Sequence, residues 1–160
     1  MNPTANKSDF EDLTTNLRDL AYSYLEKYNP SKQQLKVFLL KKYLTKIKGT
    51  KSKKEVTLII DEIILQLEKN KILNDEMYSD SKARMFLRRG YSLNKINQSL
   101  RIKGIDVEFI KKSIAKIKED KIEPDFVSAL KLCKRRRIGA VRPEANRELF
   151  YKKDMGILAR

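Results

Sequence analysis

Two stretches of the sequence decide the fold: residues 31–42 read SKQQLKVFLLKK, and residues 92–103 read SLNKINQSLRIK. Each begins with a serine, carries a leucine or isoleucine four and eight residues later, and ends in a lysine 11 residues after the serine. Apolar residues at this spacing are typical of one face of an α-helix, and a serine just before them can cap the first turn. The stretches therefore predict two equivalent helices, offset by 61 residues.

The rest of the chain also has the pattern of helices. Leucine, isoleucine and lysine recur at helical spacing, and only five glycines and four prolines interrupt them, so we predict an all-α fold. Ser8, Ser31 and Ser52 each precede Glu or Gln by three residues, the pattern of a capping box, which predicts helix starts near residues 9, 32 and 53. Further helices are predicted over residues 76–88, 93–103 and 107–119 and from Glu123–Pro124 onward, with breaks at 43–54 and 137–143.

An internal repeat organises these helices. Apolar positions of residues 60–72 match those of 110–122 at an offset of 50, and the 11-residue difference from the first offset falls in the basic segment 43–54. Any two amphipathic helices can align in this way, but matched serine and lysine positions favour a true repeat. We therefore expect an elongated, curved array of tandem three-helix units. The predicted parts are an N-terminal extension (1–20), repeat 1 (21–74), repeat 2 (75–124) and a partial, C-terminally incomplete repeat 3 (125–160).

Composition favours binding over chemistry. The 160 residues include 36 Lys and Arg against 21 Asp and Glu, a net charge of +15 that attracts polyanions. Histidine is absent and Cys133 is the only cysteine, which excludes imidazole catalysis, histidine-ligated metals and intrachain disulfides. No phosphate-binding glycine motif, signal peptide or membrane span is apparent, so we expect a cytoplasmic protein without cofactor or metal.

Two basic segments are candidate contact sites. Residues 131–137 (KLCKRRR) form the densest charge run, whose mutual repulsion an anionic partner would relieve, although a solvated helix face is the simpler interpretation. Residues 86–105 are similar to a helix-turn-helix, with a glycine after each of two helices. In a DNA-binding protein the second helix would present side chains to the major groove: Asn94, Lys95, Asn97, Gln98 and Arg101. A nuclease would need converging carboxylates, which nothing in the sequence specifies.

An ordered set of motifs resembles the central repeat of the RecX family of recombinase regulators. The motifs are residues 71–79 (KILNDEMYS), 84–92 (RMFLRRGYS) and 103–106 (KGID), and the resemblance extends over about residues 20–160. It implies a curved array of three-helix repeats that binds the RecA nucleoprotein filament and inhibits its recombination, ATPase and coprotease activities, without chemistry of its own. The basic insertion and the end at Arg160 depart from the family pattern.

We therefore predict a monomeric negative regulator of RecA whose basic side chains contact the filament. The alternative is a free-standing basic protein with helix-turn-helix-like units that binds single- or double-stranded DNA without a recombinase. The candidate contact residues are Arg88, Arg89, Lys95, Arg101, Lys103, Lys134, Arg135, Arg136, Arg137 and Arg142.

Overall fold

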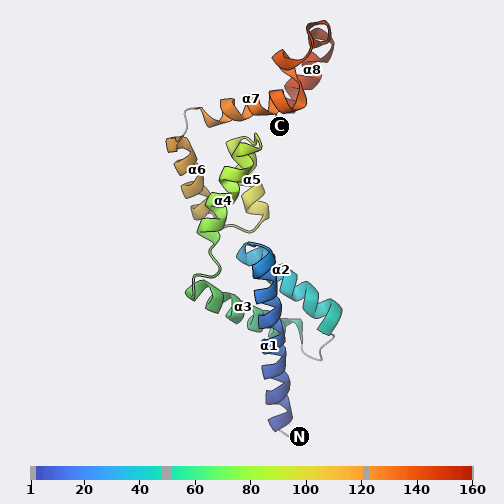
Figure 1. Cartoon of the computed structure of the whole chain (residues 1–160). Coiled ribbons are helices and arrows are strands. Elements are labelled where there is room, and N and C mark those ends of the chain that lie inside the picture. The colour runs from blue at the N-terminus through green and yellow to red at the C-terminus, as the bar shows by residue number, and fades with distance from the viewer. Residues whose placement is uncertain (1–2, 48–51, 121–122, 160) are drawn as a thin grey trace. The chain divides into compact units, whose positions relative to one another are not determined.

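A computed structural model describes residues 3–47, 52–120 and 123–159, and within these ranges the chain forms helices and no strand (Figure 1). The all-α prediction is confirmed, whereas the elongated shape and the tandem repeat stay predictions. The α-helices are α1 (Pro3–Lys27), α2 (Lys32–Lys42), α3 (Lys53–Lys69), α4 (Asp75–Arg88), α5 (Leu93–Ile102), α6 (Val107–Asp120), α7 (Pro124–Arg136) and α8 (Arg147–Leu158). A π-helical turn η1 (Tyr43–Ile47) and two 3-10 turns, η2 (Gly139–Val141) and η3 (Glu144–Asn146), complete them. In the described ranges, every helix is too short or too polar to span a bilayer.

The predicted helix starts depend on serine caps, and most are confirmed. Ser31 and Ser52 form complete capping boxes with the residue three positions further on, and Ser92 accepts a hydrogen bond at the start of α5. The start predicted near residue 9 is wrong, because α1 begins at Pro3 and Ser8 lies inside the helix. A proline suits a first helical turn, since its missing N–H needs no partner there. Helix α1 ends at Lys27, so it extends across residue 20, where the sequence analysis placed the end of the N-terminal extension.

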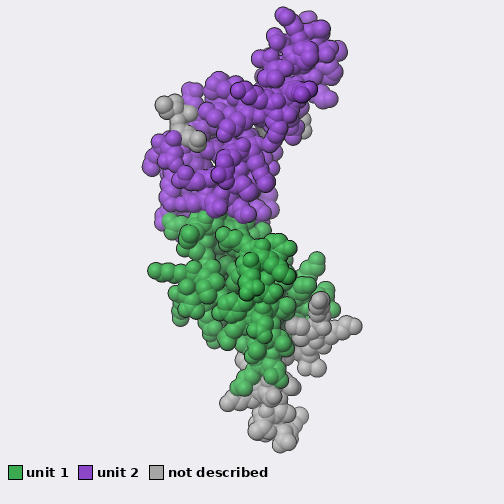
Figure 2. Space-filling view, in the orientation of Figure 1, with its two compact units in different colours: residues 1–78 green, residues 79–160 purple. Residues whose placement is uncertain are grey.

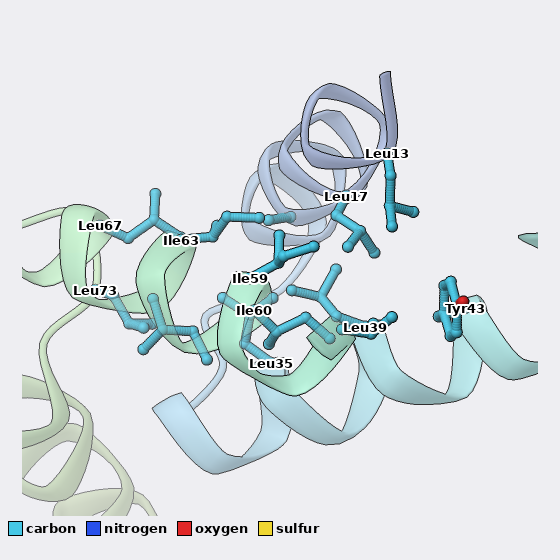
Figure 3. Packing of buried hydrophobic residues seen from close by; sticks show 13 residues of the cluster. Leu13, Leu17, Leu35, Leu39, Tyr43, Ile59, Ile60, Ile63, Leu67 and Leu73 are labelled. Atoms are coloured by element: carbon cyan, nitrogen blue, oxygen red, sulfur yellow. The ribbon is translucent and has the colours of Figure 1, made fainter. Parts of the chain in front are cut away.

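The chain forms two compact units, 1–78 and 79–160, whose border falls within α4 (Figure 2). In the first unit α1, α2 and α3 pack against one another, and Figure 3 shows Leu17, Leu39 and Ile60 in the apolar cluster between them. All three side chains are fully buried. Burial of a leucine or isoleucine side chain stabilises a fold by about 1.5–3 kcal/mol, so this cluster is the main source of stability of the unit.

A buried carboxylate ties the start of α4 to the start of α2. Asp75 is only 5% exposed, and its Oδ1 accepts the backbone N–H of Lys32 at 2.9 Å. Burial raises the pKa of Asp75, although the N–H donor partly offsets that rise. The hydroxyl of Tyr78 lies 2.9 Å from Oε1 of Gln34 and strengthens the same junction.

In the second unit a polar network joins α4 to α6. The hydroxyl of Ser113 donates to Oδ1 of Asp80 at 2.5 Å and lies 2.8 Å from the hydroxyl of Ser79. Lys116 forms an ion pair with the other oxygen of Asp80 at 2.5 Å. Burial alone would raise the pKa of Asp80, but hydrogen bonds from Lys116 and Ser113 outweigh it and hold the pKa below its usual value. Buried apolar side chains of the second unit include Phe86, Ile96, Leu100, Ile110 and Ile117.

Candidate functional site

Helix α7 lies in close contact with the turn between α4 and α5. Gly90 has φ +82°, a conformation that glycine adopts readily and other residues rarely do. A Cβ atom added there would lie 3.1 Å from the carbonyl oxygen of Ser128 and 3.4 Å from the backbone nitrogen of Leu132, both in α7. The missing side chain therefore lets the backbone of α7 approach the turn directly.

A cavity of about 760 Å³ lies within the second unit beside this contact. Its walls are the α4–α5 turn, the first turn of α5, one face of α7 and the C-terminal end of α8. The apolar part of the lining comes from α7 and α8, through Ala129, Leu132, Ile157 and Leu158. Its cationic part consists of Arg89, Lys95, Arg135 and Arg136.

The cavity carries an excess of positive charge. Asp125, the one carboxylate among the described residues of its lining, already accepts the amide of the first residue of α5 at 2.6 Å. Arg135 donates to the carbonyl oxygen of Arg89 at 2.7 Å, and the ammonium of Lys95 lies 5.4 Å from the ring centre of Tyr91. Across the described part of the chain, none of the four cations of the lining forms an ion pair with a carboxylate. Their field is therefore available to an anion.

A buried hydroxyl in the lining also lacks a partner. Ser128 is 2% exposed, and its Oγ makes no hydrogen bond with any residue that the structure describes. Burial of a polar group without a partner costs about 1–3 kcal/mol, so such groups are rare in folded proteins. The Oγ atom is buried, so it belongs to the packing of α7 rather than to the surface that a ligand meets.

The structure brings four of the ten predicted contact residues together: Arg89, Lys95, Arg135 and Arg136 line the cavity. The remaining cations outside it are Arg88, Arg101, Lys103, Lys134 and Arg137, and Arg101 donates to the side-chain oxygen of Asn97 at 2.8 Å. The structure tests none of these ten as partner contacts, so they stay predictions.

Arg142, the tenth candidate, is engaged within the fold. Its guanidinium donates to both carboxylate oxygens of Asp154, at 2.7 and 3.0 Å, and lies 4.4 Å from the ring centre of Phe150. Asp154 also accepts the backbone N–H of Gly139 at 2.8 Å. The hydrogen bond from Arg142, and after it the one from Gly139, hold the pKa of Asp154 below its usual value. The hydrogen bond to Asp154 also raises the pKa of Arg142. Through Asp154 of α8, Arg142 and Gly139 link that helix to the 3-10 turn η2.

Sequence reasoning did not single out four residues of α7 in the cavity lining: Asp125, Ser128, Ala129 and Leu132. Together with the predicted Arg136 they recur at three- and four-residue spacing along α7 and therefore share one face of that helix. This periodicity is the sequence signal for that face. Among the described residues, no three Cys, Asp or Glu side chains converge as metal ligands would.

Fold and cavity together define an all-α protein with a cation-rich cavity in its second unit. The chain is similar to the regulatory protein RecX of Myxococcus xanthus (strain DK1622), with 32% identity over 148 residues, which covers 91% of this chain and 78% of that protein. The chain belongs to the RecX family. No family model matches it. No solved structure matches it either.

Proposed function

We propose that this protein is a negative regulator of RecA: it binds the RecA filament assembled on DNA and inhibits recombination, ATP hydrolysis and coprotease activity. One observation carries the proposal, the similarity to a regulatory protein RecX over 91% of the chain. In this function the protein performs no chemistry of its own and acts by occupying the filament.

Charge supports the proposal. A nucleoprotein filament presents DNA phosphates and protein carboxylates, and the chain carries a net charge of +15. Arg89, Lys95, Arg135 and Arg136 offer their charges around one cavity without an internal ion pair in the described residues. Arginine and lysine bind both phosphate and carboxylate, so such a surface suits a partner that contains both.

The test is DNA-dependent ATP hydrolysis by a bacterial RecA on single-stranded DNA, titrated with this protein. Binding of the protein to the same DNA without RecA is measured beside it at the same salt concentration. We expect inhibition at protein concentrations well below those that saturate naked DNA. If hydrolysis stays unchanged while the protein is in excess over RecA, the proposed regulation is refuted.

The high charge also favours a second candidate, a free-standing protein that binds nucleic acid without a recombinase. In that case ATP hydrolysis would fall only at concentrations that coat the DNA. Simultaneous replacement of Arg135, Arg136 and Arg137 by alanine separates the role of this basic run from that of overall charge. We expect weaker filament binding and a smaller salt dependence with unchanged helicity, and unchanged binding would remove these residues from the interface.

A further inference from the structure

We propose that the cavity of the second unit is a docking site for an acidic peptide segment of the partner protein. A carboxylate side chain of that segment lies among the arginines, and a neighbouring apolar side chain contacts Leu132. This inference rests on the proposed function and extends it, because it identifies a surface of the regulator that contacts the partner protein rather than DNA.

The two halves of the cavity lining specify two kinds of ligand group. Arg89 and Arg136 have forked donors that bind a carboxylate at two points. Ala129 and Leu132 form an apolar surface beside these charges. A segment that alternates acidic and apolar side chains would satisfy both halves, whereas a purely anionic ligand would leave the apolar half without a contact.

The aromatic content of the cavity argues against nucleic acid. Proteins that bind single strands stack bases on exposed aromatic rings. Tyr91 is the one aromatic residue in the described lining, and its ring is stacked on Phe86 with a centroid distance of 5.1 Å and an interplanar angle of 3°. The ammonium of Lys95 also lies over the Tyr91 ring. The ring is therefore engaged within the protein.

The test compares the binding of two probes to two double variants. The probes are a fluorescent dodecapeptide that repeats glutamate, glutamate and leucine, and a fluorescent dodecamer of thymidylate, both measured by anisotropy at the same salt concentration. The cavity pair is Arg89→Ala with Arg136→Ala. The control pair, Arg88→Ala with Lys134→Ala, removes the same charge from the same two helix ends but not from the lining.

We expect the cavity pair to weaken peptide binding by about tenfold and the control pair by less than about twofold, while both pairs weaken DNA binding equally. Equal loss of peptide binding in both pairs would show attraction by overall charge and overturn the proposal. Absence of peptide binding to the unaltered protein, or selective loss of DNA binding in the cavity pair, would overturn it too. These binding measurements need no RecA, so they stand even if inhibition of ATP hydrolysis fails.

Discussion

The substitution Gly90→Ala tests whether α7 rests on the turn that forms one wall of the cavity. At φ +82° a residue with a Cβ atom is strained by about 1–2 kcal/mol. The added methyl group would also lie 3.1 Å from the oxygen of Ser128 and 3.4 Å from the nitrogen of Leu132. Both are backbone atoms of a helix, which cannot rotate away, so overpacking adds about 1–3 kcal/mol. We expect a total destabilisation of about 2–5 kcal/mol.

Gly139→Ala is the matched control for backbone strain without overpacking. Gly139 also has positive φ, at +60°, but the nearest atom to an added Cβ is Sγ of Cys133 at 3.9 Å, an ordinary contact. The control should therefore lose about 1–2 kcal/mol, which is the strain alone. The difference between the two variants isolates the close approach of α7.

Thermal unfolding followed by circular dichroism at 222 nm measures both variants. For a domain of about 60–100 residues, each kcal/mol lowers the midpoint by about 4–8 °C, so the two variants should be clearly separated. Gly90→Ala should also weaken binding of the acidic peptide, since α7 must shift away from Arg89. Equal midpoints for the two variants would refute the close packing of α7 on the turn and, with it, the shape of the cavity.

Three further outcomes follow from buried polar groups. Asp75→Asn keeps an acceptor for the N–H of Lys32 and removes a charge that burial disfavours, so its stability at pH 7 should equal or exceed that of the unaltered protein. Asp75→Ala removes the acceptor and should lose about 1–3 kcal/mol. Urea unfolding measures the stability of both variants. Ser113→Ala should lose about 1–3 kcal/mol in the same assay, because Asp80 loses a buried donor. The pKa values of Asp80 and Asp154 are lower in the folded state, so their stabilisation is complete above about pH 5 and disappears as the pH falls through the folded-state pKa. Midpoints measured from pH 6 to pH 2 should therefore fall, and Asp154→Asn should reduce that fall.

Local signals in the sequence were sufficient to predict most of the helices. Ser31, Ser52 and Ser92 cap helices as expected, since a capping hydroxyl and its amide lie within three residues of each other. The failure at Ser8 has a similar local cause. The same pattern can occur inside a helix, and Pro3 begins this helix one and a half turns earlier.

The cavity could not be predicted in this way, because its walls come from distant parts of the sequence. Arg135 donates to the carbonyl of Arg89 across 46 positions, and no periodicity within either helix specifies that contact. Burial of the Ser128 hydroxyl likewise depends on packing between segments. Periodicity predicts which residues share a face of α7, but not what that face will meet.

Backbone contact, rather than density of charge, selects the cations of the cavity. Lys134 and Arg137 belong to the densest basic run of the sequence and do not line the cavity, whereas Arg89, in the turn after α4, does. The reason lies in Gly90, which ends α4 with a positive φ and also leaves room for the backbone of α7. The main chain thus places Arg89 and Arg136 on the walls of one cavity, and neither forms an ion pair with a carboxylate of the described residues. Their charges are therefore not neutralised within the described part of the protein, and an acidic ligand would neutralise them on binding.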